Sequence, residues 1–329
     1  MSTTQLLIDT AERIFTDYCD KTALDIAEAG EFPAALWAVL QDAGFHELAV
    51  IDNGVGLSDV FAILKVAGRH AVPLPLSEIL FANRWLHSTD GFATIGLRRG
   101  DEVIDLPWGR KCDRVLALTP ASADAESGSA NLVLVEGSLG TLGQNLAGEA
   151  RDTYHIDSQE VVATAEDAFV MLALGRTVQM AGALERVMAL SLQYVGEREQ
   201  FGRTISRFQA IQHILAVMAA ETAAAARAAD AAVAAAEQLA PGGPSERFVL
   251  EVAAAKSRVG EAGGRVVEMA HQVHGAMGYT HEHRLHHYTR RVWAWRDEYG
   301  TESHWQLKLG SQLAAIGADG LWDFLATRG

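Results

Sequence analysis

The sequence is poor in cysteine, in positive charge and in long apolar segments. Its 329 residues include only Cys19 and Cys112, which excludes a disulfide framework and fits a reducing cytosol. The formal net charge of −15 makes a nucleic-acid partner an unexpected one, because phosphate backbones repel acidic surfaces. No stretch reaches about 18 apolar residues without a charge, so no membrane span is expected. The N-terminus lacks a basic segment followed by an apolar one, so we expect no secretory signal and a cytoplasmic protein.

Composition divides the chain into three regions and predicts an α+β fold that is mainly α. Residues 1–88 have the pattern of an N-terminal helical domain, residues 89–162 that of a short β domain, and residues 163–329 that of a helical bundle. Apolar residues make up 49% of the chain and charged residues 21%, which is typical of a folded globular protein.

The N-terminal and middle regions carry different periodicities. Apolar spacing predicts helices over residues 6–14, 32–43 with Gly44 as C-terminal cap, 60–71 and 77–86. Short β-branched and apolar runs predict strands over 114–118 and 131–135, with a polar loop over 119–129.

The C-terminal region is rich in alanine and reads as four long helices. They are predicted over residues 165–194, 208–239 with a stop at Pro241–Pro244, 245–275 and 302–325. Long helices joined by short connections favour an antiparallel four-helix bundle.

The connection between the first two of these helices concentrates positive charge. Arg198, Arg203 and Arg207 lie there in an otherwise acidic chain, and the planar guanidinium fork suits phosphate oxygens. The alternative is a solvated loop with surface ion pairs.

A second motif follows the third long helix, from Gln272 to Thr280. Its glycines, Gly275 and Gly278, are three residues apart and allow a backbone to approach a ligand closely. The alternative is an ordinary turn that caps a helix.

Together, in this order and at this separation, the two motifs resemble those of the acyl-CoA dehydrogenases. That family carries an Arg-x-x-Phe-Gly turn and a Gln-x-x-Gly-Gly-x-Gly turn in its C-terminal bundle. Phe32-Pro33 and Pro73-Leu74-Pro75 also fit, so the resemblance covers nearly the whole chain. It implies the family fold: a helical domain, a small β domain and a C-terminal four-helix bundle. It also implies FAD and the oxidation of acyl-CoA to 2-enoyl-CoA.

In the oligomers of that family, both turns reach the pyrophosphate and adenosine of an FAD held by a neighbouring subunit. The resemblance therefore implies cofactor binding by six residues: Arg198, Phe201, Gln209, Gln272, Gly275 and Thr301. The second glycine of the family motif is Ala276 here.

The catalytic loop departs from the family pattern, which reads Tyr-Glu-Gly-Thr. This chain reads Glu298-Tyr299-Gly300-Thr301, so Tyr299 stands where the base belongs. A phenol with a pKa of about 10 is a weak base for a C2 proton. Glu298 would serve only if the loop shifted by one residue.

Some family members place the base near the start of the first bundle helix instead. That position falls near Leu172, and the closest acids, Glu166 and Asp167, are about a turn away. The sequence thus predicts no catalytic residue in a usual position.

The segments that hold the flavin in this family are also missing. Neither a Glu-Pro-x-x-Gly-Ser-Asp loop nor a Trp-Ile-Thr strand occurs between residues 89 and 162. The chain resembles the shorter subunit of actinobacterial α2β2 acyl-CoA dehydrogenases that act on steroid side chains. The resemblance implies FAD shared at an interface with a full-length subunit, and an electron-transferring flavoprotein as acceptor.

Two other interpretations stay open. One is a self-sufficient homotetrameric acyl-CoA dehydrogenase that uses Glu298 as its base. The other is a non-enzymatic acyl-CoA-binding or scaffold relative that binds no FAD.

Histidines and tryptophans gather near the C-terminal motifs. Six histidines lie between residues 271 and 287, but no cysteine or acidic cluster accompanies them, so no metal site is predicted. Trp293, Trp295 and Trp305 flank the altered loop, either as packing residues or as side chains that fill a vacated substrate site.

Overall fold

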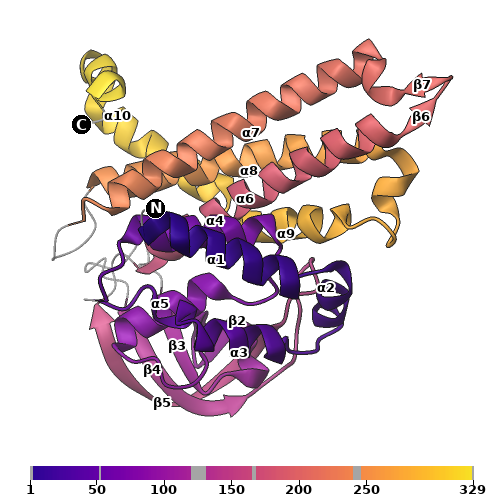
Figure 1. The fold of residues 1–329 in the computed structure, drawn as a ribbon. Helices are drawn as coiled ribbons and strands as arrows, with labels where there is room; N and C mark the ends of the chain where they lie inside the picture. Colours follow the sequence, from indigo (N-terminus) through magenta and orange to yellow (C-terminus); the bar gives the residue numbers. More distant parts are fainter. Residues whose placement is uncertain (1–2, 52, 120–130, 165–167, 240–245, 328–329) are drawn as a thin grey trace. The chain divides into compact units, whose positions relative to one another are not determined.

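The computed structural model describes residues 3–51, 53–119, 131–164, 168–239 and 246–327 (Figure 1). It contains two compact units, residues 1–175 and residues 176–329. We call them unit 1 and unit 2 and describe each by itself. The predicted loop beyond residue 119, the predicted helix end at Pro241–Pro244, and both Glu166 and Asp167 lie outside the described residues.

Unit 1 begins with five helices. These are α1 (Thr3–Tyr18), α2 (Lys21–Glu28), α3 (Ala34–Asp42), α4 (Leu57–Arg69) and α5 (Leu76–Leu86). Asp20 caps α2 by accepting a hydrogen bond from the Ala23 amide at 2.8 Å. Gly44 has a φ of 72° just after α3, which is the left-handed conformation expected of the predicted cap.

The strands of unit 1 form a closed barrel in the order β1-β2-β5-β4-β3. They are β1 (Ala93–Arg99), β2 (Glu102–Pro107), β3 (Arg114–Thr119), β4 (Asn131–Leu139) and β5 (Arg151–Thr164). All neighbouring pairs are antiparallel except β1 with β3, which closes the ring. Alternate apolar side chains, such as Val103, Val115 and Val133, fill its interior.

An ion pair between Arg110 and Asp152 joins the turn after β2 to strand β5. Asp152 is fully buried, and both its carboxylate oxygens accept hydrogen bonds from Arg110, the shortest at 2.6 Å. The side-chain hydrogen bond with Asp152 raises the pKa of the Arg110 guanidinium further, so Arg110 keeps its charge.

Unit 2 contains long helices and one small hairpin. The elements are α6 (Ala168–Glu197, which begins in unit 1), β6 (Glu199–Gln200), β7 (Arg203–Thr204), α7 (Gln209–Ala236), α8 (Glu246–His274), α9 (Leu285–Asp297) and α10 (Glu302–Thr327). Helices α7 and α8 pack closely side by side, and the β6–β7 hairpin projects from the end of the bundle (Figure 1). α10 is kinked at Gly317, which has a φ of 75°.

The predicted fold class, α+β and mainly α, is confirmed. All four long helices of the predicted bundle are present, but α9 was not predicted. Its buried residues Leu285, Tyr288, Val292 and Trp295 do follow a helical period. The boundaries predicted for the three domains stay a prediction. Among the helices that the structure describes, none combines the length and apolar character needed to cross a bilayer.

Candidate functional site

The arginine-containing connection between α6 and α7 folds into a hairpin. Strands β6 and β7 pair antiparallel, and the two turn residues, Phe201 and Gly202, have φ values of 53° and 77°. Two successive left-handed residues are typical of a type I′ turn, which fits the twist of a tight hairpin. The hairpin leaves the Arg198 side chain at its base.

A cavity of about 440 Å³ lies where this base meets the end of α8. It is lined by Tyr194, Arg198, Gln200, Ile205, Gln272, Val273, His274, Gly275, Ala276 and Met277. Three of the predicted cofactor residues, Arg198, Gln272 and Gly275, therefore surround one cavity although Arg198 and Gln272 are 74 positions apart in the sequence.

Two polar side chains of this cavity are available to a ligand. Within the described part of the chain, neither the exposed Arg198 guanidinium nor the exposed Gln272 amide forms a hydrogen bond or ion pair. Arg203, by contrast, lies over the Phe208 ring at 4.2 Å. The interpretation of surface ion pairs thus does not describe Arg198, and its charge is free to meet an anion.

Gly275 gives the cavity an open side. Its φ is 58°, a conformation that L side chains rarely adopt. Apart from its chain neighbours, no described atom lies within 4 Å of the place where a Cβ would stand. A glycine is therefore required here by backbone conformation, and the space beside it is open to a ligand.

The other predicted cofactor residues lie outside the lining of this cavity. Phe201 is 90% exposed at the hairpin tip, where its ring meets Phe208 edge-on, and Gln209 is exposed at the start of α7. Thr301 caps α10, since its hydroxyl accepts from the His304 amide at 3.3 Å. Their role in cofactor binding stays a prediction.

An aromatic wall that was not predicted backs the cavity. The ring of Tyr194 stacks on His274 with centroids 4.5 Å apart and an interplanar angle of 22°, and His283 meets Tyr194 edge-on. His274 is buried, and its Nδ1 donates to the Ala270 carbonyl at 2.7 Å. Burial lowers the pKa of His274 to about 4, so its imidazole is uncharged at neutral pH.

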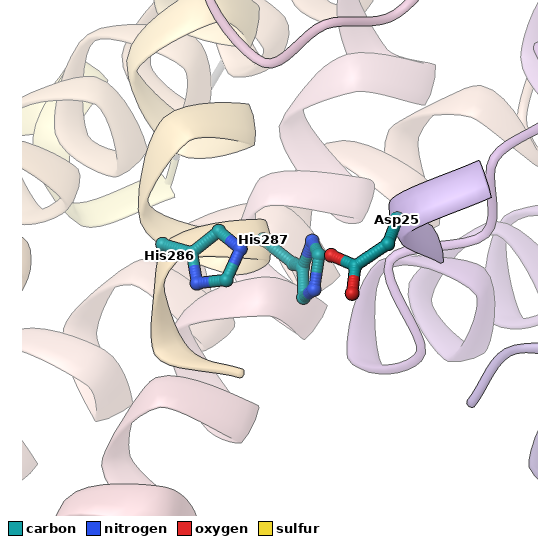
Figure 2. A group of neighbouring side chains, drawn as sticks. All are labelled: Asp25, His286 and His287. Atoms are coloured by element: carbon teal, nitrogen blue, oxygen red, sulfur yellow. The ribbon is translucent and has the colours of Figure 1, made fainter. Parts of the chain in front are cut away.

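The remaining histidines pack in smaller groups. His271 stacks on Tyr279, and Figure 2 shows the neighbouring rings of His286 and His287 on α9, with centroids 4.0 Å apart. Asp25, the third side chain in that figure, belongs to unit 1, where it accepts a hydrogen bond from Lys21 at 2.5 Å. That no metal binds stays a prediction.

The altered catalytic loop is held by a buried arginine. Arg176 on α6 is 2% exposed; its Nε donates to Glu298 at 2.5 Å and its Nη1 to Gln179 at 2.6 Å. The guanidinium also lies 5.5 Å from the Trp295 ring centroid and 5.9 Å from that of Tyr299. The Glu298 carboxylate is thus already engaged by a cation inside unit 2.

Tyr299 occupies a strained and buried position in this loop. Its φ is 55°, it is 7% exposed, and its carbonyl accepts from the Trp305 indole at 3.0 Å. Trp295 and Trp305 are buried, so the structure places them as packing residues around the loop, whereas Trp293 is partly exposed beneath Arg296. Glu302, the first residue of α10, accepts from Arg296 at 2.6 Å.

A buried lysine ties α9 to α8 next to this loop. Lys256 is 1% exposed, and its Nζ donates to the carbonyls of Trp295 at 3.1 Å and Arg296 at 2.7 Å. These carbonyls end α9, where a cation is favoured. Burial nevertheless lowers the pKa of Lys256 from 10.5 to about 8. The positive charge of Arg176 lowers this pKa further, whereas the negative charges of Glu302 and Glu298 raise it.

Lys256 should give unit 2 a distinctive alkaline stability profile. Between pH 8 and 10.5 the unfolded chain binds the proton that the native Lys256 has released, so stability should rise with pH. The gain should approach about 3 kcal/mol relative to Lys256→Met, whose profile lacks this step. Urea unfolding of both proteins across this range measures the difference, and parallel profiles would contradict it.

The chain is similar to acyl-CoA dehydrogenases and, over a shorter segment, to a 3-sulfinopropanoyl-CoA desulfinase of Paraburkholderia xenovorans (strain LB400) and an acryloyl-CoA reductase (NADH) of Anaerotignum propionicum. Residues 162–304 match the family described as acyl-CoA dehydrogenase, C-terminal domain. The acyl-CoA dehydrogenase IpdE2 of Mycobacterium tuberculosis (strain ATCC 25618 / H37Rv) is 26% identical over 306 residues, which cover 88% of this chain and 90% of that protein. Two other curated relatives, 33% and 37% identical, align over 27% of their own length, so the chain matches about a quarter of each.

Solved structures show the same fold. A chain of the ChsE4–ChsE5 complex from Mycobacterium tuberculosis superposes with a TM-score of 0.83 at 20% identity, covering 97% of this chain and 99% of that one. A chain of the Tcur3481–Tcur3483 steroid ACAD superposes with a TM-score of 0.82 at 21% identity, covering 95% and 98%. At such identities the likeness concerns the fold alone.

Proposed function

We propose that this chain, whose residues 162–304 match the acyl-CoA dehydrogenase C-terminal domain, is one subunit of a heteromeric, FAD-dependent acyl-CoA dehydrogenase. In this proposal the enzyme forms a 2-enoyl-CoA from an acyl-CoA thioester, for which bound FAD would supply the hydride acceptor. The chain contributes residues to the adenosine and pyrophosphate end of the cofactor, and the partner contributes the flavin pocket and the base.

One observation carries this proposal: the cavity where Arg198, Gln272 and Gly275 meet. The donor set fits a dinucleotide, because a free guanidinium can hold phosphate oxygens through paired hydrogen bonds and an amide can add another. The open space beside Gly275 lets a bulky anion approach the backbone. Arg198 would orient the pyrophosphate.

The state of the catalytic loop supports a base on the partner. Tyr299 stands in the base position but is buried, and Glu298 is bound to Arg176 at 2.5 Å. A base must reach its proton within hydrogen-bond distance, and a side chain held by a buried cation is poorly placed for this. The sequence between residues 89 and 162 also lacks the segments that hold the flavin in this family.

The partner and substrate follow from the same family. We propose a full-length acyl-CoA dehydrogenase as partner, in an α2β2 assembly, and an electron-transferring flavoprotein as electron acceptor. The similarity to a chain of the ChsE4–ChsE5 complex and to the Tcur3481–Tcur3483 steroid ACAD supports a heteromer, and the latter name supports a steroid side-chain CoA as substrate.

Flavin content tests the assignment of Arg198. In the complex purified after co-expression with a full-length acyl-CoA dehydrogenase, we expect about one FAD per two chains. Arg198→Ala should weaken FAD retention about ten- to a hundredfold, since one charge-assisted hydrogen-bonded contact is lost. Absorbance near 450 nm during dialysis measures it. Arg207→Ala is the matched control, because Arg207 is exposed in the same connection but does not line the cavity.

Other outcomes would favour the other interpretations. Yellow protein from the chain alone, at one FAD per chain, would favour the homotetramer, and Glu298→Gln should then abolish turnover. Colourless protein with every candidate partner would favour the non-enzymatic acyl-CoA-binding relative. Unchanged flavin content in Arg198→Ala would remove Arg198 from the site.

A further inference from the structure

The cavity beside Arg198 presents two kinds of surface to a ligand. One is polar and cationic, formed by Arg198 and Gln272; the other is the ring of Tyr194. Arginine and amide groups account for the phosphates of a nucleotide but leave its base without a partner. A contact with the base should therefore come from the aromatic side of the cavity.

Two imidazoles pack against the Tyr194 ring, and one of them, His274, also lines the cavity. His274 covers one ring face at a centroid distance of 4.5 Å, and His283 stands nearly perpendicular to the ring at 6.1 Å. His274 and His283 are themselves 4.8 Å apart, and the His274 ring is anchored to the Ala270 carbonyl. A side chain held on one face by a buried ring loses little further freedom when a ligand meets it.

Tyr194 is the more accessible of the two stacked rings that line the cavity. It stays partly exposed, whereas His274 is 2% exposed. The His274 imidazole is neutral, so charge in this part of the site rests on Arg198. An aromatic ring and a guanidinium that line the same cavity match the two halves of a nucleotide, base and phosphate.

We infer that Tyr194 is a positioning residue for the cofactor, and that the nucleobase of a bound adenine dinucleotide stacks on its cavity side. The inference rests on the proposed function and adds to it the residue that orients the base. His274 and His283 hold the Tyr194 ring in place. Stacking requires only a π face, so the site should accept ADP and inosine diphosphate about equally well.

Separating the base from the phosphates tests this inference. ADP and inorganic pyrophosphate are titrated by calorimetry into the full-length chain and into the co-purified complex stripped of FAD. Tyr194→Leu should weaken ADP binding about tenfold or more and leave pyrophosphate binding within about twofold. Tyr194→Phe keeps the ring and should restore ADP affinity.

A spectroscopic signal and a matched control accompany these titrations. The adenine H2 and H8 resonances should move upfield on binding to the wild type and to Tyr194→Phe, because the base lies over a ring, but not with Tyr194→Leu. Tyr279→Leu is the control: Tyr279 also stacks on a histidine, His271, at 4.6 Å, but lies outside the cavity lining. Circular dichroism checks that each variant is folded.

Each outcome separates the two proposals. If Tyr194→Leu binds ADP like the wild type, or loses ADP and pyrophosphate equally, the stacking inference is overturned and the cavity keeps its phosphate role. If neither wild-type chain nor stripped complex binds ADP or pyrophosphate, the proposed function fails at this cavity and the inference fails with it.

Discussion

Replacing Arg176 by methionine should lower the free energy of unfolding of unit 2 by about 3–5 kcal/mol, because it removes the cation from a buried ion pair and leaves its carboxylate in place. Arg176 is 2% exposed and the Glu298 side chain 18%, so water can compensate only part of the loss. The guanidinium also packs against Trp295 and Tyr299, and that packing weakens too. Urea unfolding followed by tryptophan fluorescence measures the change.

A double substitution separates the ion pair from simple packing. Arg176→Met combined with Glu298→Leu removes both charges, and we expect it to recover at least about 2 kcal/mol of the loss. If the double variant is as unstable as the sum of the two single ones, the charges do not interact and the account of the loop is wrong.

Replacing Gly137 by alanine should destabilise unit 1 by about 4 kcal/mol or more. A Cβ at this position would stand 1.8 Å from the His155 carbonyl oxygen on the neighbouring strand, a backbone atom that cannot rotate away. Gly137 lies at a register shift between β4 and β5, where the strands approach each other closely. The pairing must open to admit the methyl group, so barrel hydrogen bonds are lost as well.

The control for Gly137 lies in the same barrel. Gly100, in the turn between β1 and β2, has a φ of 64° and no described atom within 4 Å of a Cβ, its chain neighbours aside. Gly100→Ala should therefore cost only about 1–2 kcal/mol, from backbone strain alone. In thermal unfolding, Gly137→Ala should have a clearly lower midpoint temperature than Gly100→Ala. Equal midpoints would show that strands β4 and β5 can move apart to admit the methyl group.

Secondary structure was predicted well from the sequence where the apolar residues follow a simple periodicity. Helix α4 was predicted over residues 60–71 and lies at Leu57–Arg69, and the strand predicted at 114–118 is β3 (Arg114–Thr119). Helix α9 was missed although its apolar residues are correctly spaced, because arginines and histidines between them hide the pattern. Short α2 was missed as well, although Asp20 marks its start.

The candidate site was predictable only in its local motifs. Arg198, Gln272 and Gly275 stand in recognisable turns, and the structure gathers them at one cavity. Tyr194 gave no such signal, since an aromatic residue inside a helix reads as core.

Arg176 was hidden for a different reason. It lies in the middle of an apolar helix, and its partner Glu298 is 122 residues away. Only the tertiary fold shows that the pair exists, because no local pattern links the two positions.

The closed barrel of unit 1 has consequences for how the chain reaches its native state. Because the ring formed by the five described strands has no unpaired edge, these strands offer no template for edge-to-edge association. Closure requires β2 to find β5, pairing Glu102 with His155, about fifty residues apart. Such non-local pairing is slow compared with helix formation, so strand docking should set the folding rate of unit 1. Until the ring closes, β2 and β5 remain exposed edges, and that interval is when the chain is most prone to aggregate.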